Sequence, residues 1–272
     1  MRTARMNMKN AASRVMLATF CFLFVLAGLA GTARGATDEE IMQRARQSYY
    51  NLKDEGLVKY RCRLVPDWKS MAKSLTADAS AQELFPLLSG ERFEVAIGPD
   101  GASSISHHSD QTPPNEQAAE RLRKVTGGLE QTVTGFFQMW SVFMFNSPLP
   151  DAGESYLLED LGERYRVTYK VGANDVVTTM TKDLAIDEMK VTTPSEEITV
   201  RPHFSVIKKR FVLSGFEGTV RAASREDTEK MRIEYQEVDD LELPHVVQMD
   251  GAMPGMAIEV PIVFDRYDVT TR

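Results

Sequence analysis

Two small groups of side chains in this chain have the donor types of a metal site. His107, His108 and Asp110 combine imidazole with carboxylate, and both are zinc ligands. The second group combines an imidazole with thioethers, which suit monovalent copper, and consists of His245, Met249, Met253 and Met256. Adjacent histidines in a Ser-rich segment are usually solvated, and methionines beside a Gly-Pro turn usually supply apolar surface. We therefore predict no metal and no cofactor, and keep both sites as alternatives.

The sequence carries no catalytic motif. The spacings H-E-x-x-H, G-x-S-x-G and G-x-x-x-x-G-K-[ST] do not occur. Acidic pairs such as Asp239 and Asp240 are neighbours that would point to opposite faces of a strand, so they do not converge as an acid–base pair must. Cys62 is expected to be a buried structural residue, with a reactive thiol as the alternative. We predict a protein that is not an enzyme, and the least favoured alternative is a hydrolase with scattered active-site residues.

The N-terminal segment has the layout of a secretory signal peptide. Four basic residues and no acidic one accompany an apolar run from Val15 to Ala30, and small residues at Ala33 and Gly35 provide cleavage sites. A transmembrane helix needs roughly 20 apolar residues, more than this run contains. We predict that residues 1–35 are a cleaved signal peptide and that the remaining chain is periplasmic. The alternative is an uncleaved anchor.

The chain that follows this segment is strongly acidic. Residues 1–33 hold four of the 32 basic residues and none of the 39 acidic ones, so 28 basic and 39 acidic residues remain and the net charge is −11. Binding of nucleic acid needs clustered Lys and Arg, and we predict no nucleic-acid partner. The remaining length suits one large β-rich domain, so we predict a single domain over residues 36–272.

The first elements of this domain are predicted from capping and periodicity. Thr37 and Glu40 have the spacing of a capping box at a helix start. Apolar residues at three- and four-residue steps continue the helix over 38–55, with Gly56 as its C-cap. Residues 58–64 alternate between apolar and basic, which predicts a strand with one buried face.

The next segments are predicted from their turn residues. Residues 67–88 are expected to form one or two helical turns that stop at Pro86. A strand at 93–97 leads into a tight turn at 99–101, where Pro, Asp and Gly suit a hairpin. Residues 103–115 are mostly Ser, His, Asp and Pro, and are expected to form a loop.

The segment 116–146 is predicted to be a helix whose two halves differ. The first half is amphipathic, whereas the second is apolar on nearly all sides and must be buried all round or face an apolar ligand. Gly127 and Gly128 are expected to bend the helix or act as a hinge. The candidate ligand-binding residues lie in the second half: Phe136, Phe137, Met139, Trp140, Phe143 and Met144. The alternative is that these side chains fill the core.

The chain from residue 156 onward has the pattern of short strands joined by local turns. Strands are expected at 164–171, 174–181, 185–192, 204–213, 216–222, 231–236, 245–250 and 257–269. Such a pattern is typical of a meandering antiparallel sheet with one face covered. We predict an α+β fold in which helices cover or fill the concave face of a strongly curved antiparallel sheet, an incomplete β-barrel.

Two stretches of this region resemble a known family. MRIEYQEVDDLELPHVV at 231–247 and LAIDEMKV at 184–191 are similar to strands of the periplasmic outer-membrane lipoprotein carrier and lipoprotein-sorting family. The resemblance loosely covers residues 38–65 and 155–270. It implies an incomplete β-barrel, closed by helices, that carries acyl chains across the periplasm. The family's lid-latching arginine has two candidates here, Arg61 and Arg63.

These observations predict an exported, non-enzymatic protein that binds a lipid, a lipoprotein acyl chain or another hydrophobic ligand in the hollow of its sheet. Movement of the helix near Gly127 would admit and release the ligand, and contact with the membrane would be peripheral rather than integral. The alternative is an interaction module whose core is filled by its own side chains and whose acidic surface meets an envelope protein.

Overall fold

The computed structural model describes residues 36–70, 79–223, 225–253 and 256–272. The predicted signal peptide, residues 1–35, lies outside the described residues. Residues 42–272 form one compact unit, and the described residues before Met42 belong to an N-terminal unit.

Helices are few and strands are many in the described chain. The helices are α2 (Asp38–Gln47), α4 (Ala79–Ser89) and α5 (Glu116–Met144). The strands are β1 (Leu57–Pro66), β2 (Glu91–Ile97), β3 (Ser103–Ser109), β4 (Tyr156–Asp160), β5 (Arg164–Val171), β6 (Asn174–Thr181), β7 (Ile186–Thr192), β8 (Glu196–Ile207), β9 (Arg210–Ala222), β10 (Arg225–Val238), β11 (Leu241–Met253) and β12 (Met256–Thr271).

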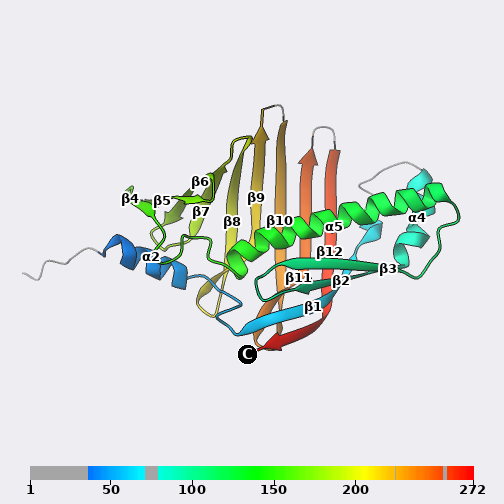
Figure 1. Cartoon of the computed structure of the whole chain (residues 1–272), viewed down its shortest axis with the longest axis horizontal. Helices are drawn as coiled ribbons and strands as arrows, with labels where there is room; N and C mark the ends of the chain where they lie inside the picture. Colours follow the sequence, from blue (N-terminus) through cyan, green and yellow to red (C-terminus); the bar gives the residue numbers. More distant parts are fainter. Residues whose placement is uncertain (1–35, 71–78, 224, 254–255) are drawn as a thin grey trace, which may run out of the picture. The chain divides into compact units, whose positions relative to one another are not determined.

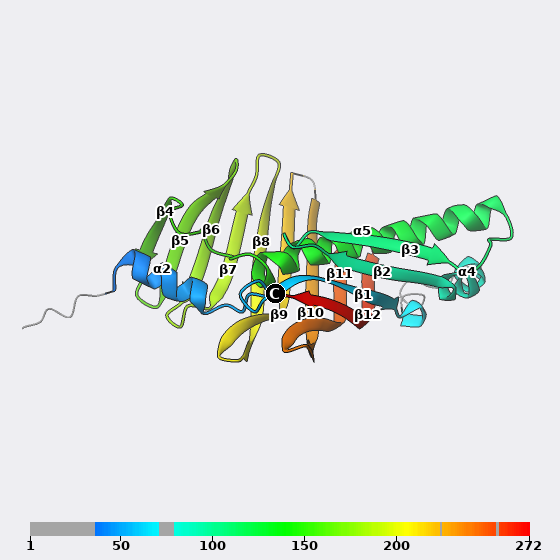
Figure 2. The same ribbon diagram turned by 60° about the horizontal axis from the view of Figure 1, so that its bottom comes forward.

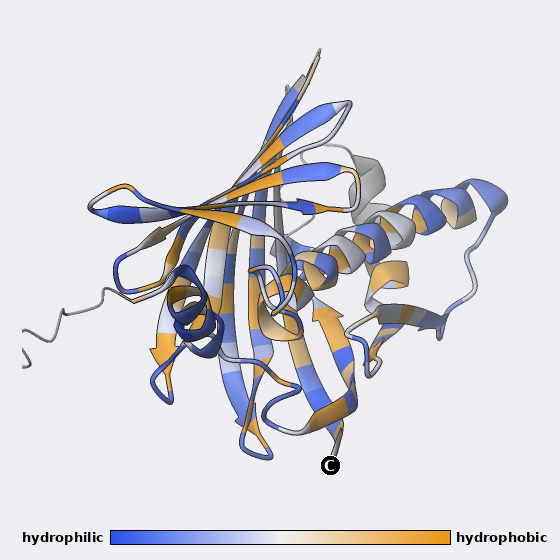
Figure 3. Cartoon of the chain, turned by 60° about the vertical axis from the view of Figure 1, so that its left-hand side comes forward, coloured by the Kyte–Doolittle hydropathy of each residue, from blue (hydrophilic) through white to orange (hydrophobic). Residues whose placement is uncertain are grey.

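All these strands belong to one open antiparallel sheet with β3 and β4 at its edges (Figure 1). Strands β4 to β12 follow one another as a meander, and β1 then pairs with β12, so that β1–β3 extend the sheet beyond its last strand. Hydrophobic and hydrophilic residues alternate along many of the strands (Figure 3). This alternation buries one face of each strand, and the predicted large antiparallel sheet with a few helices is confirmed.

The sheet is curved, and α5 packs against one of its faces (Figures 1 and 2). This helix runs across the strands and meets several in succession (Figures 1 and 2). Glu130 meets His107 of β3, Phe136 meets Phe264 of β12, Trp140 meets Tyr235 of β10, and Phe143 meets Phe204 of β8. These contacts place α5 against strands from β3, at one edge of the sheet, as far as β8.

The predicted helix over 38–55 is too long. The capping box at its start is confirmed, because the backbone N–H of Thr37 donates to the Glu40 carboxylate at 2.7 Å and Glu40 N–H donates to the Thr37 hydroxyl at 3.3 Å. The helix ends at Gln47 because the chain then pairs with β9: the Tyr50 N–H donates to the Phe211 carbonyl at 3.0 Å. Pairing with a distant strand overrides the local helical pattern.

Two predictions between β1 and α5 are wrong. Helix α4 continues past Pro86 to Ser89, because burial of Leu87 and Leu88 in this last turn offsets the hydrogen bond lost at the proline. The predicted loop at 103–115 contains β3, an edge strand with exposed Ser and His side chains. Its hairpin with β2 is closed by a turn in which Gly101 has φ +83° and donates to the Gly98 carbonyl. Backbone pairing, rather than burial, makes this segment a strand.

Candidate functional site

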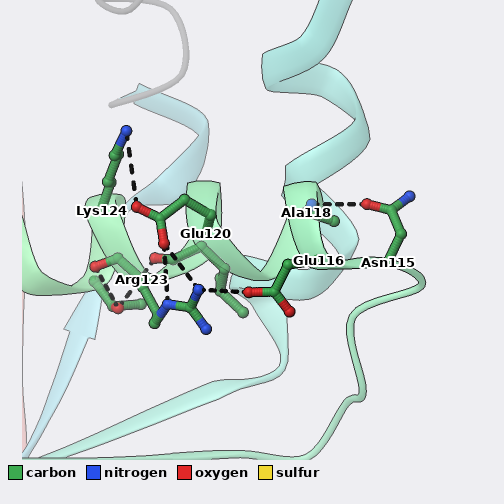
Figure 4. Close-up of polar contacts among 8 residues, drawn as sticks. Asn115, Glu116, Ala118, Glu120, Arg123 and Lys124 are labelled. Atoms are coloured by element: carbon green, nitrogen blue, oxygen red, sulfur yellow. Dashed lines mark hydrogen bonds and ion pairs between the residues drawn. The ribbon is translucent and has the colours of Figure 1, made fainter.

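Helix α5 begins with a strong local cap. The Asn115 side chain accepts a hydrogen bond from the Ala118 N–H at 2.9 Å (Figure 4). One turn further, Arg123 reaches Glu116 at 2.9 Å and Glu120 at 2.8 Å. These contacts lie within the exposed part of the helix, so its first half is stabilised by its own residues.

Gly127 and Gly128 do not interrupt the helix. Both are exposed within α5, and a Cβ at either position would meet nothing within 4 Å. Neither glycine is therefore required by close packing. Their role as a hinge stays a prediction.

The second half of α5 forms an aromatic cluster with the sheet. The ring centroids of Phe136 and Phe137 are 4.7 Å apart, and Phe137 lies edge-on to Trp140 at 5.8 Å. Phe264 of β12 stacks on Phe136 at 5.9 Å and meets Phe137 edge-on at 5.5 Å. Offset and edge-on ring pairs of this kind add to the stabilisation from buried area.

Polar contacts fix this cluster to the strands at a few points. The Trp140 Nε1–H donates to the Tyr235 hydroxyl at 3.0 Å, and that hydroxyl donates to the Leu213 carbonyl at 2.6 Å. The Met144 carbonyl accepts from the Leu52 N–H at 2.8 Å. Burial holds the pKa of Tyr235 far above its ordinary value, so the hydroxyl stays protonated and can donate.

The middle of α5 is joined to the sheet edge by a polar contact. Nδ1 of His107, on β3, lies against the Glu130 carboxylate. The two side chains are 40% and 33% exposed, so solvent weakens this pair, and a value of at most about 1 kcal/mol is reasonable. The pair nevertheless joins α5 to β3, in addition to the contacts of its aromatic end with β12, β10 and β8.

A group of buried hydroxyl and thiol side chains lies on the core face of β1 and β12. The Tyr60 and Tyr267 rings are 5.4 Å apart, and the Tyr267 hydroxyl donates to the Pro244 carbonyl. Burial raises the pKa of Cys62 to about 12 and that of Tyr60 well above its ordinary value. The Tyr60 hydroxyl has no hydrogen-bond partner among the described residues. The predicted structural character of Cys62 agrees with its 2% exposure.

The structure brings the six candidate ligand-binding residues together on α5. Five of them are buried by the protein itself and Met139 is half-buried; the buried ones are Phe136, Phe137, Trp140, Phe143 and Met144. Neither the cleft of about 550 Å³ on β1–β3 nor the cleft of about 300 Å³ beside α4 is lined by any of them. In the described chain these side chains pack on protein.

Sequence reasoning missed the strand residues that complete the cluster. Phe264 and Tyr235 lie at buried or half-buried positions of β12 and β10. The alternating sequence predicts the strands that carry these two residues. It does not predict that they contact α5, because only the fold brings β10 and β12 beneath that helix. Arg61 and Arg63 do not latch the helix. They lie on the face of β1 opposite to the buried Cys62, and Arg63 is paired with Asp265.

The structure also shows the surroundings of the two alternative metal-binding groups. His107 is engaged by Glu130, and His108 Nε2 lies 3.8 Å from Asp110. In the second group His245 Nδ1 lies 3.1 Å from the Phe264 carbonyl and Met249 is buried. The side chains of the other two methionines lie outside the described residues. Among the residues described, no three His, Cys, Asp or Glu side chains are arranged to hold a metal ion.

Comparisons with known proteins add no relative. No protein-family model, curated protein or solved structure matches this chain. The resemblance to lipoprotein carriers therefore stays a prediction. Within the described part of the chain, the helices are too short or too polar to cross a membrane.

Proposed function

We propose that this chain is an exported, non-enzymatic protein that binds a lipid, a lipoprotein acyl chain or another hydrophobic ligand in the hollow of its curved sheet. In the ligand-free state the aromatic end of α5 fills this hollow. The ligand replaces it when α5 moves. The observation that carries the proposal is the aromatic cluster on α5, which packs across an open sheet instead of within a closed barrel.

The contacts of α5 are compatible with such a movement. Its first half is stabilised by its own cap and ion pairs, so it can stay helical away from the sheet. The polar links that join it to the strands are few, and the pair of Glu130 with His107 is half-exposed. If α5 moved away with its aromatic rings, apolar strand residues such as Phe264 would be exposed on the sheet. Burial of an acyl chain against them is worth about 0.8 kcal/mol per CH₂.

A second function is favoured by one observation. Five of the six candidate residues are buried by the protein itself, as expected for a core that is permanently filled. The chain would then be an interaction module, and its acidic surface would meet an envelope protein. The two proposals differ in whether α5 leaves the sheet.

Uptake of a fluorescent fatty acid by the full chain tests the first proposal. Glu130→Gln removes the charge that pairs with His107, and Glu120→Gln makes the same change where the carboxylate contacts only its own helix. Loss of up to about 1 kcal/mol from the closed state should speed uptake by up to about fivefold in the first variant. The second variant should behave like the unchanged protein. No uptake in any of the three would favour the filled core, whereas uptake at equal rates would show that the contact between Glu130 and His107 does not hold α5 on the sheet.

A further inference from the structure

A cleft of about 550 Å³ lies on β12, β1, β2 and β3, where the N-terminal strands extend the sheet. Its charged side chains belong to the strand face that points away from the core, because Tyr60 and Cys62 at alternate positions of β1 are buried. Four arginines line this cleft, together with the Ser106 hydroxyl: Arg61, Arg63, Arg92 and Arg266.

The cleft gathers cationic side chains on an acidic chain, whose net charge is −7. Four arginines and two acidic residues, Glu94 and Asp268, line it, and Asp265 and Asp110 pair with two of the arginines. Guanidinium groups that keep free N–H donors attract an anion to this place on the surface.

Two of the arginines are positioned by neighbouring groups. The Arg63 Nε–H donates to Asp265 at 2.7 Å, and a second nitrogen of the same guanidinium contacts the other oxygen of that carboxylate. Arg92 contacts Asp110 at 3.3 Å and donates to the Ser89 carbonyl at 3.0 Å. These two guanidinium groups are therefore held in place, and the paired carboxylates balance their charge.

The other two arginines are available to a ligand. Arg61 lies 3.9 Å from Glu94, a loose contact between side chains that are 67% and 55% exposed. Arg266 makes no ion pair within the described ranges of the chain. Its backbone has φ +52°, in the left-handed region that arginine rarely adopts.

A β-bulge causes this conformation. Arg61 is opposite Asp268 and Arg63 is opposite Asp265. Between these pairs, Cys62 of β1 faces two residues of β12, Arg266 and Tyr267. Bulges beside functional sites redirect a side chain, and a backbone outlier of this kind is a reason to look for function. Here the bulge leaves the exposed Arg266 among the residues that line the cleft.

We propose that this cleft binds a phosphate group, with Arg61 and Arg266 as the direct contacts and the Ser106 hydroxyl as an additional donor. Planar guanidinium groups match phosphate oxygens in pairs, and Arg61 and Arg266 offer two such groups to one phosphate. The cleft is larger than inorganic phosphate, so the ligand is a phosphate ester, either a soluble one or the headgroup of a lipid. This site is on the strand face opposite to the aromatic cluster and does not depend on movement of α5.

Binding of glycerol phosphate to the full chain, measured by calorimetry at low salt, tests the soluble source. Cosedimentation with phosphatidylglycerol vesicles, against phosphatidylcholine vesicles, tests the headgroup. The variant Arg61→Ala/Arg266→Ala removes the two direct contacts. Its matched control is Arg201→Ala/Arg221→Ala, which removes the same charge from exposed positions on β8 and β9. Melting temperatures equal to that of the unchanged protein would show that neither variant has lost its fold.

Binding that weakens about tenfold or more in the cleft variant, and much less in the control, supports the proposal. If this pattern is seen with glycerol phosphate, the ligand is a soluble ester; if it is seen with phosphatidylglycerol vesicles alone, the ligand is a headgroup. No binding in either assay, or equal weakening in the two variants, overturns the proposal. Neither assay measures fatty-acid uptake, so the test of the phosphate site can fail while the proposed carrier function stands, and the reverse.

Discussion

The pKa of Cys62 makes the stability of the fold sensitive to alkaline pH. Burial raises the pKa of this thiol from its usual 9.0 to about 12. Between these values the unfolded chain loses the proton and the folded chain keeps it, so stability is complete below pH 9 and falls as the pH rises toward 12. The free energy of unfolding should fall by about 1.4 kcal/mol per pH unit from this group.

Denaturation in urea at pH 8.0 and pH 9.5 measures this fall. Cys62→Ala removes the titrating group, and its stability should change less between the two pH values. The buried tyrosines, whose pKa values are also raised, lower the stability over the same range, but both proteins contain them, so the difference between the two falls belongs to Cys62. The same fall in both proteins would contradict the assignment to Cys62.

Gly215 is required by the close approach of two strands. A Cβ at this position would overlap the Met231 carbonyl oxygen on β10. Gly215→Ala should therefore lower the free energy of unfolding by about 1–3 kcal/mol through backbone displacement. Gly218→Ala is the control, since its nearest neighbour is the Phe216 ring at 3.5 Å. Chemical denaturation measures both variants, and equal stabilities would show that the strands can separate without strain.

The turn between β8 and β9 was missed because its residues carry no turn signal. The range 204–213 was expected to be a single strand, but it contains the turn between β8 and β9 at Lys208 and Lys209, both with positive φ. Such a turn is normally signalled by Asn-Gly or Asp-Gly, and a lysine pair carries no such signal. This turn instead joins two long strands that pair as far as Ile207 and Arg210. Lys208 Nζ also donates to the Asp240 carbonyl.

At the scale of elements, α5 was the most predictable. Its cap, apolar spacing and following prolines mark its start and end to within about two residues, because all these signals are local. The end of α2 and the whole of β3 were mispredicted because partners distant in sequence decide them. The pairing of β1 with β12 joins opposite ends of the chain, and no local pattern could have predicted it.

The glycines of α5 allow a test of the hinge. Exposed Gly costs a helix about 1 kcal/mol relative to Ala, and a Cβ has open space at Gly127, Gly128 and Gly135. Alanine at any of the three should raise the melting temperature. If the pair Gly127-Gly128 bends during ligand exchange, the double alanine variant should also release a bound fluorescent fatty acid more slowly.

Gly135→Ala is the control for this experiment. It lies in the same helix and has the same open surroundings, but it is outside the predicted hinge. It should stabilise the protein without slowing release. Equal slowing in both variants would assign the effect to helix stability, and unchanged release in both would remove the hinge from the mechanism.

At the scale of the whole molecule, the aromatic cluster was predicted and its surroundings were not. Apolar spacing identified the residues of α5, but the sequence cannot distinguish side chains that pack on strands from those that line an empty hollow. The two clefts described above lie elsewhere, and the arginines of the larger one come from β1, β2 and β12. Its residues are scattered over more than 200 positions of sequence, so no motif marks them.

Export of the chain is tested by the mass of the mature protein. The full chain, expressed in a bacterium, should appear in the periplasmic fraction after loss of residues 1–33 or 1–35, because small residues end the apolar run at both sites. Intact-mass spectrometry identifies the cleavage site. An uncleaved protein in the membrane fraction would instead support the anchor.

The most direct test of the account is to identify what copurifies with the protein. Native mass spectrometry of the full chain after expression, followed by organic extraction, should recover a stoichiometric lipid. A still-folded variant with Ser in place of Trp140 and Phe143 should lose it, because these side chains belong to the proposed ligand-binding group. A protein that carries no lipid and takes up no fluorescent fatty acid would contradict the carrier function and indicate a core filled permanently by α5.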